Sequence, residues 1–365
     1  MNKANSTTLT SAAPAPSKPM VRWWRRWPEW IHYATMAWMF VYGALGLFWA
    51  LGGSGFPLGL LGDPTADHSL FRQAVSATGG TLIACFSFIG MTALIFSNRR
   101  GAVRVIRLLY GWSAAAILCF AIPDPRALMG VAYAPVSLIA FLSGQSLHYL
   151  AFFTWPVVHQ YICLLGGLLW AASTLTWYRR MHNACSYCGQ KEGRTDHRIS
   201  SAARWGTWAT YAAILAPAYY DMTRIAWLLG IPFGISREML HDLQVSGADW
   251  AGAGLALVSM GGAYLTHGLI RPWGEVFPRW FPLCGGRRVP PLLAVVPAGF
   301  VAILLTVTGI QVIFEFMWSG DFENWGGTTP LLLLPLWGIA LGAAAISYYK
   351  RRQGHCRHCS EADHP

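Results

Sequence analysis

Charged residues are scarce in this sequence. Only 12% of the 365 residues are Asp, Glu, Lys or Arg, whereas 54% are hydrophobic. Soluble domains carry roughly 25% charged residues. A chain so poor in charge lacks the polar surface that water requires. This excludes an ordinary soluble domain and indicates that lipid contacts much of the molecule.

Motifs of several common enzyme classes are also lacking. The chain has no Walker A motif, no glycine-rich dinucleotide fingerprint after a strand, no Gly-x-Ser-x-Gly elbow and no His-Glu-x-x-His motif. It also has no polar segment large enough to form an ATP-hydrolysing domain. The sequence therefore gives no sign of a chain that drives transport with its own ATPase.

Apolar runs long enough to cross a bilayer are abundant. A membrane helix needs about 20 apolar residues, and these runs lack the two-residue period of membrane strands. A ninth run, 127–144, is interrupted by Pro and flanked by Gly, so we expect it to lie in the outer interface or to re-enter the membrane without crossing. We expect eight spanning helices, at about residues 30–52, 73–97, 104–123, 157–178, 206–230, 249–270, 291–317 and 330–349.

The distribution of Lys and Arg predicts the orientation of these helices. With both termini in the cytoplasm, the inner segments hold 23 of the 27 basic residues. Basic residues accumulate on the cytoplasmic side of membrane proteins. We therefore expect a multi-pass protein of the cell membrane with cytoplasmic N- and C-termini. The inner segments are the N-terminal tail, 98–107, 178–205, 271–288 and the C-terminal tail.

The net charge of +11 raises the question of a polyanionic partner. Because the Lys and Arg residues flank apolar runs and are not massed on a polar domain, nucleic acid is not an expected partner. Residues 22–30 interleave Arg with Trp just before the first span. Trp favours the headgroup level and Arg favours anionic lipid, so the lipid bilayer and anionic lipid of the inner leaflet are the expected partners.

An internal repeat divides the chain. Residues 30–52 and 208–230 share seven identical positions in 23, among them Trp30 with Trp208 and Trp49 with Trp227. An even number of spans returns each half to its starting side, so the fold class that we predict is an all-α integral membrane protein whose eight transmembrane helices form two parallel four-helix repeats. The predicted organisation is a basic tail (1–27), a first repeat (28–190), a linker (191–203), a second repeat (204–359) and a short tail (360–365).

Each of the two repeats ends in a Cys-x-x-Cys motif. Cys185 and Cys188 follow the fourth span, and Cys356 and Cys359 follow the eighth. Two such knuckles can supply the four thiolates of a structural zinc site, and the reducing cytoplasm disfavours disulfides. We therefore expect zinc to join the repeats. A redox-active dithiol and cysteines with no joint role stay open as alternatives.

Ionisable residues inside the predicted spans are candidates for a functional site. Asp221 and Arg224 share one face of the fifth span, His159 lies near the outer start of the fourth, and Glu315 lies near the outer end of the seventh. We expect these four to line an outward-facing cavity that binds a substrate. The alternatives are an ion pair between Asp221 and Arg224, and headgroup contacts for the other two.

A second constellation follows the fifth span. Glu238 and His241 have Glu-x-x-His spacing, and Asp242 comes next. Such residues on one helical face can hold a metal or move protons, although a solvated helix surface has the same pattern.

Two stretches carry a family resemblance. The loop from Arg271 to Trp280, the Gly285–Pro290 segment after it and the Trp-Ala-Leu-Gly-Gly stretch at 49–53 resemble actinobacterial multi-pass membrane proteins to which no activity is assigned. The resemblance implies a membrane fold over most of the chain, and it implies no substrate.

Three functions stay open on the sequence alone. The first is a small-molecule permease or transporter, because a site between two related halves is typical of transporters. The second is a membrane-embedded enzyme that acts on a lipid-soluble substrate at the outer face. The third is a non-catalytic sensor or assembly factor. The sequence does not set the oligomeric state.

Overall fold

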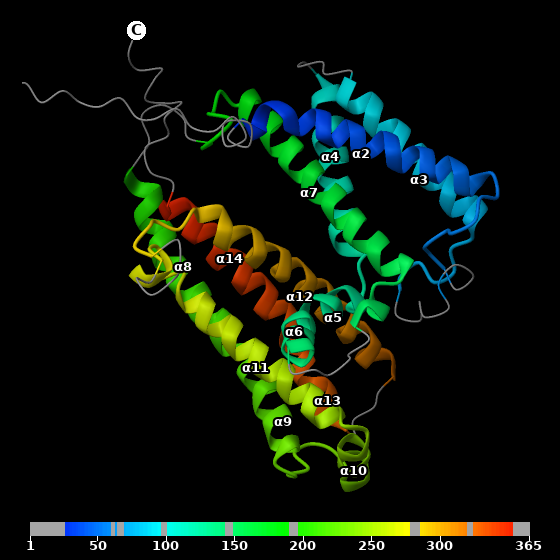
Figure 1. The fold of residues 1–365 in the computed structure, drawn as a ribbon. Coiled ribbons are helices and arrows are strands. Elements are labelled where there is room, and N and C mark those ends of the chain that lie inside the picture. The colour runs from blue at the N-terminus through cyan, green and yellow to red at the C-terminus, as the bar shows by residue number, and fades with distance from the viewer. Residues whose placement is uncertain are drawn as a thin grey trace, which may run out of the picture.

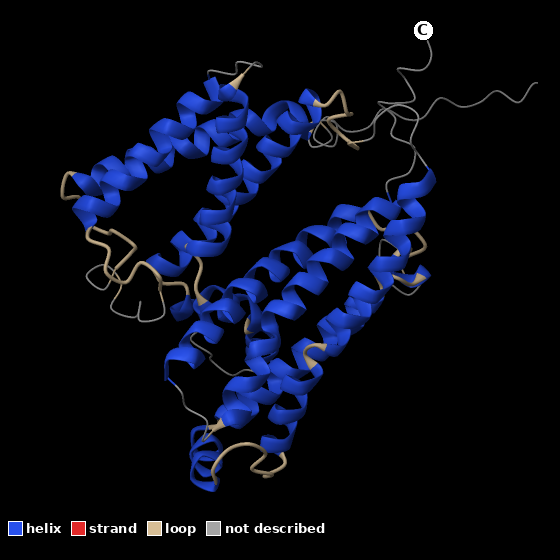
Figure 2. Cartoon of the chain, turned by 180° about the vertical axis from the view of Figure 1, so that it is seen from behind, coloured by secondary structure: helices blue, strands red, loops and turns tan. Residues whose placement is uncertain are grey.

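The computed structural model describes residues 26–59, 63, 69–95, 101–142, 149–189, 196–277, 285–319 and 324–352. The described chain is helical and contains no strand (Figure 2). An isolated antiparallel bridge joins Val276 to Arg288 in a loop. The predicted all-α class is therefore confirmed for this part of the chain.

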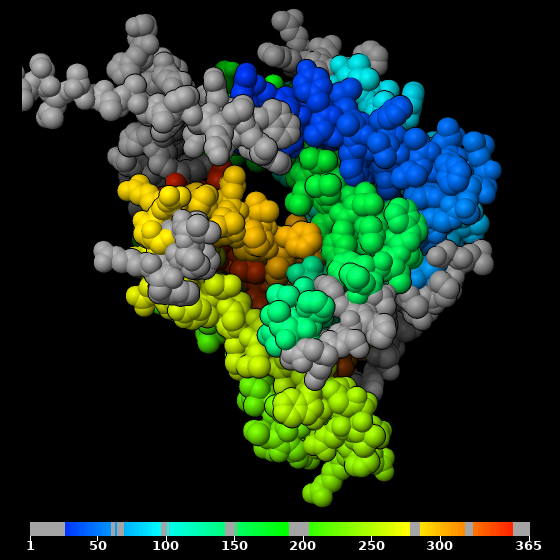
Figure 3. All heavy atoms as spheres, viewed as in Figure 1, coloured from blue at the N-terminus to red at the C-terminus, as the bar shows by residue number. Residues whose placement is uncertain are grey.

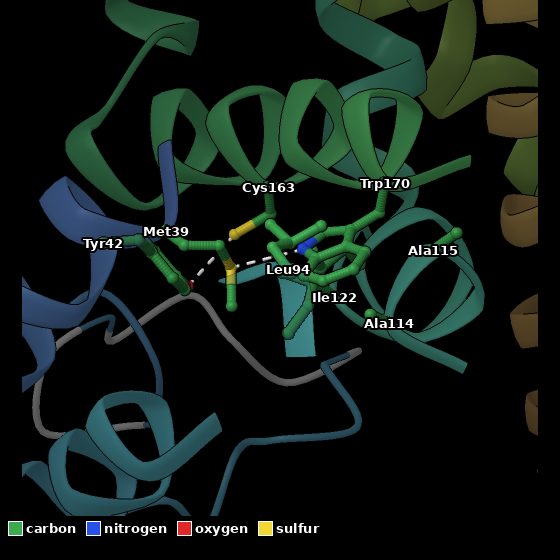
Figure 4. Packing of buried hydrophobic residues seen from close by; sticks show 9 residues of the cluster. Met39, Tyr42, Leu94, Ala114, Ala115, Ile122, Cys163 and Trp170 are labelled. Atoms are coloured by element: carbon green, nitrogen blue, oxygen red, sulfur yellow. Dashed lines mark hydrogen bonds between the residues drawn. The ribbon is translucent and has the colours of Figure 1, made fainter. Parts of the chain in front are cut away.

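The first helix group comes from the N-terminal half. It comprises α2 (Trp27–Ala50), α3 (Ser76–Ile95), α4 (Ala102–Ala116), the π-helix η1 (Ile117–Ala121), the 3-10 turn η2 (Tyr149–Phe152) and α7 (Trp155–Met181). Helix α2 packs along α3 and against α7, and α4 packs on α7 (Figure 1). Met39, Tyr42, Cys163 and Trp170 meet in the core of this group, where the Trp170 indole donates a 3.2 Å hydrogen bond to the Met39 sulfur (Figure 4).

The second helix group comes from the C-terminal half. It comprises α8 (Asp196–Leu215), α9 (Ala218–Leu228), α10 (Arg237–Ser246), α11 (Ala248–His267), the 3-10 turn η3 (Pro272–Gly274), α12 (Pro291–Ser319), α13 (Trp325–Thr328), the 3-10 turn η4 (Thr329–Leu333) and α14 (Leu334–Arg352). Helix α14 packs against both α8 and α12, and α11 packs against α8 and α9. The helix breaks between α8 and α9 because Pro217 has no N–H to donate to the preceding turn.

Two short helices connect the groups. Helix α5 (Pro125–Ala132) packs on α7 and α12, and α6 (Ala134–Leu142) packs on α11. Buried residues of four elements meet at this junction: Cys119 of η1, Ala127 of α5, Leu164 of α7 and Leu304 of α12. Gln311 Nε2 of α12 also donates a 2.9 Å hydrogen bond to the Pro123 carbonyl oxygen. The two groups are thus joined by apolar packing and by a polar contact.

Seven segments of the described chain are long and apolar enough to cross a membrane, judged by length and composition. Six of them match predicted spans, so the chain has the helices of a multi-pass membrane protein. The predicted spans 206–230 and 249–270 are not among the segments that are long and apolar enough. The first of them is split into α8 and α9. The segment that we expected not to cross, 125–142, does meet it. The seven segments are 27–50, 76–95, 103–121, 125–142, 155–181, 291–317 and 325–352.

Candidate functional site

A buried ionic cluster surrounds the start of α5. We call it the α5 cluster, and it consists of Asp63, Asp124, Arg126 and Gln160. Asp124 is 2% exposed and caps α5, with its Oδ1 accepting the backbone N–H of Arg126 at 2.9 Å. Pro125 takes the first helical position, where its missing N–H costs nothing. The local sequence therefore fixes Asp124 at the helix end.

Every charged member of the α5 cluster faces an opposite charge. Arg126 Nε donates to Asp124 at 3.1 Å, and Arg126 Nη2 lies 2.7 Å from Asp63 Oδ2. Gln160 of α7 donates from Nε2 to Asp124 Oδ2 at 2.7 Å and accepts the Asp124 backbone N–H at 3.0 Å. A buried charge is tolerated when it is paired and hydrogen-bonded in this way, and removal of one partner leaves the other uncompensated. The arrangement is that of a structural clamp between α5, α7 and the segment at residue 63.

His159, a predicted site residue, lies inside the first helix group. It is 1% exposed, its Nε2 is 2.8 Å from the Tyr42 hydroxyl, and the Cys163 sulfur is 3.4 Å away. The ring of Trp49 meets it edge-on at 6.2 Å. His159 thus points into the helix packing against α2 and does not reach a headgroup.

Asp221, the second predicted site residue, lies in the first turn of α9 just after the break at Pro217. It is 5% exposed, and its Oδ1 atom is buried with no hydrogen-bond partner in the described part of the chain. The Ser259 hydroxyl of α11 faces it, and that hydroxyl is also buried without a well-formed hydrogen bond. An uncompensated buried carboxylate costs several kcal/mol, which the helix N-terminus offsets by only about 0.3–1 kcal/mol.

Arg224 does not compensate this charge. Its guanidinium lies over the Trp227 ring at 4.2 Å and over the Tyr220 ring at 4.7 Å, and its Nη2 donates to the Gly327 carbonyl oxygen at 3.4 Å. Arg224 is directed toward its own helix and α13, and it forms no ion pair with Asp221. The ion pair that we considered as an alternative is therefore not formed.

The four predicted site residues are distributed over the molecule. Glu315 is exposed near the end of α12, and Arg224 contacts α13, which follows α12 along the chain. Asp221 and Arg224 share α9, whereas His159 belongs to α7 in the other helix group (Figure 1). The structure therefore places three of them in the second group and separates His159 from them, since its ring is enclosed by α2.

The residues of the alternative catalytic constellation lie on α10. Glu238, His241 and Asp242 are exposed, and His241 Nδ1 is 4.0 Å from Asp242 Oδ1, with both side chains mostly in solvent. No group of three or more His, Cys, Asp or Glu side chains in the described residues is placed to hold a metal ion. Their arrangement is that of a solvated helix surface.

The first Cys-x-x-Cys motif forms a compact turn. The Gly189 N–H donates a 2.7 Å hydrogen bond to the Cys185 carbonyl oxygen, and Gly189 adopts a φ of +75° that favours glycine. Arg179 Nη1 donates to the carbonyl oxygens of Ser186 and Tyr187 at 3.1 and 3.2 Å. Cys188 lies in this turn, whereas Cys356 and Cys359 lie outside the described residues.

The α5 cluster is the feature that sequence reasoning missed. The signal for Asp124 was present, because an Asp between two prolines before an apolar run is typical of a helix cap. Asp63 gave no signal, since nothing local relates it to Arg126.

Comparison of the chain with known proteins gives no match to a family model, to a curated protein or to a solved structure. The resemblance to actinobacterial membrane proteins therefore stays a prediction.

Proposed function

We propose that this chain is a small-molecule transporter of the cell membrane in which the Asp221 carboxylate binds a proton or a cation that accompanies the substrate. The observation that carries the proposal is the buried Oδ1 atom of Asp221, which has no hydrogen-bond partner among the described residues. Ionisable groups buried in a membrane segment mark ion and substrate pathways.

The helix break beside Asp221 supports the same proposal. Transporters place substrate and ion sites where a spanning helix is discontinuous, because the unwound turn leaves polar groups at membrane depth. Helix α8 ends at Leu215, α9 begins at Ala218, and Asp221 follows within one turn. In our proposal Arg224 and Glu315 contact the substrate from the same helix group, whereas His159, which is buried against Tyr42 of α2 in the first group, does not.

The proposed architecture is eight spans in two parallel repeats, with α5 and α6 not crossing and both termini cytoplasmic. Corresponding helices support it: α2 packs on α3 and α7 as α8 packs on α11 and α14, and α4 packs on α7 as α12 packs on α14. Corresponding loops support it too. Trp155 Nε1 donates to the Gly55 carbonyl oxygen at 2.8 Å, and the Gly326 N–H donates to the Gly234 carbonyl oxygen at 2.7 Å.

A hydrophobic carbodiimide tests the state of Asp221 without knowledge of the substrate. Such reagents form stable adducts with protonated carboxyl groups in apolar surroundings. A buried carboxyl without a counter-charge takes up a proton, so peptide mass spectrometry is expected to find the adduct on Asp221. Asp124 is the matched control: it is equally buried, but its carboxylate is engaged by Arg126 and Gln160, so we expect it to stay unlabelled. Equal labelling of both residues would contradict the proposal, and no label on Asp221 would exclude a bound proton and leave a bound cation, which the Na⁺ and K⁺ dyes below test.

Proteoliposomes test transport itself. Vesicles loaded with a pH-sensitive dye, or with dyes for Na⁺ or K⁺, are challenged with pools of sugars, amino acids, organic cations and other small solutes. A solute-dependent ion flux that is lost in Asp221→Asn and kept in Glu238→Gln supports the proposal. Glu238→Gln is a suitable control because Glu238 is exposed on α10. Absence of flux for every pool in the native protein would count against transport.

A second proposal is that Cys185 and Cys188 bind a structural zinc ion together with Cys356 and Cys359. The turn closed by Gly189 supports it, because it places Cys185 and Cys188 together in one tight loop. Elemental analysis of the purified protein is expected to find about one zinc per chain by the stoichiometry of a four-thiolate site. The fourfold Cys→Ser variant is expected to lose it, and Cys85→Ser, an exposed cysteine elsewhere, is expected to keep it. Metal-free protein would overturn this proposal and leave the transport proposal untouched.

A further inference from the structure

An apolar groove lies between α11 and α12, with α14 as its floor. In Figure 3, atoms of the red α14 are visible in a hollow between the yellow α11 and the orange α12. Its volume is about 640 Å³, within the range of roughly 300–1,000 Å³ that is usual for ligand pockets. The walls and floor include Leu265 of α11, Leu293 and Val301 of α12, and Trp337 and Leu341 of α14.

The rims of the groove are apolar and exposed. Leu265 is 68% exposed and Leu293 is 56% exposed, one on each side of the opening. The hydroxyl of Thr266, which also lines the groove, is bonded to the Gly262 carbonyl oxygen of its own helix at 2.8 Å. In a membrane-embedded chain such an opening faces hydrocarbon, so a hydrocarbon chain fits this groove better than a polar solute.

The loop after α11 forms a roof over one end of the groove. Trp273 and Phe277 of this loop line the groove, and the Trp273 ring stacks on Tyr264 at 5.0 Å. Backbone hydrogen bonds of 2.9 Å join Phe277 to Arg287 and Gly286. The end of α14 fixes the roof as well.

Contacts from Tyr348 and Arg352 of α14 hold this roof. The Tyr348 hydroxyl donates to the Gly274 carbonyl oxygen at 3.0 Å, and Arg352 Nη1 donates to the Glu275 carboxylate at 3.1 Å. The roof is therefore preformed. Because the Glu275 carboxylate is paired with Arg352, it does not neutralise the other arginines near the roof.

Three arginines belong to the roof or to the segment paired with it: Arg271 lies at the start of the loop, and Arg287 and Arg288 pair through their backbones with Phe277 and Val276. Arg271, Arg287 and Arg288 are all exposed, and Arg271 Nε donates to His267 Nε2 at 2.9 Å. Aromatic rings at the headgroup level and arginines next to them are the chemistry that recognises an anionic headgroup above its acyl chain.

We propose that the groove binds one acyl chain of an anionic phospholipid from the inner leaflet, and that Arg271, Arg287 and Arg288 hold its phosphate beside Trp273. The apolar groove buries the acyl chain, and the three positive charges favour an anionic headgroup over a neutral one. This site is separate from Asp221 and does not depend on transport, whereas its assignment to the inner leaflet rests on the proposed cytoplasmic termini.

Two neighbouring glycines provide the sharpest test. A Cβ atom at Gly262 or at Gly261 would meet nothing within 4 Å, so a side chain can leave the backbone at either position without a clash. Gly262 lines the groove, whereas Gly261 does not. Gly262→Trp is therefore expected to fill the groove, and Gly261→Trp is the matched control on the next face of the same helix.

Native mass spectrometry of the detergent-purified protein measures lipid binding directly. With added phosphatidylglycerol, the native chain and Gly261→Trp are expected to carry a bound lipid, and Gly262→Trp is expected to lose it. Phosphatidylcholine is expected to bind more weakly. Replacing Arg271, Arg287 and Arg288 by Gln is expected to lower phosphatidylglycerol affinity by roughly fivefold per arginine, toward that of phosphatidylcholine.

Three results would overturn the proposal. Equal lipid binding by the two tryptophan variants would place the lipid elsewhere. Equal binding of the two lipids by the native chain would remove the role of the arginines. A dimer that is present in the native chain and lost in Gly262→Trp would identify a second copy as the occupant of the groove.

Discussion

The guanidinium of Arg224 lies 4.2 Å from the centroid of the Trp227 ring, one helical turn further along α9. This stacking holds the guanidinium of Arg224 against rings of its own helix and directs it away from Asp221. A residue pair that looked from the sequence like an ion pair is therefore a stacked cation and a separate buried carboxylate.

A double-mutant cycle separates these two relationships. We expect Arg224→Gln and Trp227→Phe to be coupled by about 0.5–2 kcal/mol of unfolding free energy, because a cation over an indole ring contributes that much. Arg224→Gln and Asp221→Asn are expected to show coupling near zero. Thermal unfolding in detergent is the measurement. A coupling between Asp221 and Arg224 above that of the stacked pair would show that the two residues form an ion pair in solution.

The α5 cluster predicts a large loss of stability when its cation is removed. Arg126→Gln leaves Asp124 and Asp63 buried beside each other without a counter-charge, and breaking such a pair costs about 3–5 kcal/mol. Arg237→Gln, on the surface of α10, is expected to change the unfolding free energy by less than about 0.5 kcal/mol. If the two variants unfold alike, the cluster does not stabilise the fold.

Partial rescue provides a second check on the α5 cluster. Adding Asp63→Asn and Asp124→Asn to Arg126→Gln removes the uncompensated charges, so the triple variant is expected to be more stable than Arg126→Gln alone. A triple variant that is less stable than the single one would argue that these positions act through shape and not through charge.

The contact between α2 and α3 depends on glycine. A Cβ atom added to Gly80 would lie 2.5 Å from the backbone nitrogen of Ala50 and 2.7 Å from the carbonyl oxygen of Gly46. These are backbone atoms, so the helices must separate, and Gly80→Ala is expected to destabilise the protein by about 1–3 kcal/mol. Gly261→Ala has open space and is expected to be neutral or stabilising by up to about 1 kcal/mol, since alanine favours helix. Equal melting temperatures for the two variants would contradict this close packing.

The number of crossings is testable by cysteine labelling in intact cells. In the eight-span arrangement, single cysteines at Arg26 and Arg287 lie on the cytoplasmic side, and one at Ser246 lies outside. If residues 125–142 cross the membrane, the orientation of everything after them inverts, so Ser246 and Arg287 exchange their accessibility. A membrane-impermeant maleimide, applied to variants whose native cysteines are replaced by serine, distinguishes the two arrangements.

Much of the fold was predictable because its signals are local. Apolar runs of helical length identified six of the seven candidate spans, whereas the break at Pro217 divides residues 206–230, which we had predicted as one span. The α5–α6 segment was harder, because its composition suits both a crossing and an interfacial helix. The candidate site was less predictable than the fold. Asp221 was found because a charge within an apolar run stands out, whereas the partners of Arg126 could not be found.

The sequence by itself determined the class of this protein, since scarce charge and long apolar helices require lipid as solvent. Only the tertiary structure decided which polar groups meet. Asp63 and Arg126 come together from distant segments, His159 turns toward Tyr42, and Arg224 stacks on Trp227. Hydropathy and periodicity define which residues form a helix, whereas packing against the neighbouring helices defines the direction of each side chain and leaves the buried Oδ1 atom of Asp221 without a hydrogen-bond partner among the described residues.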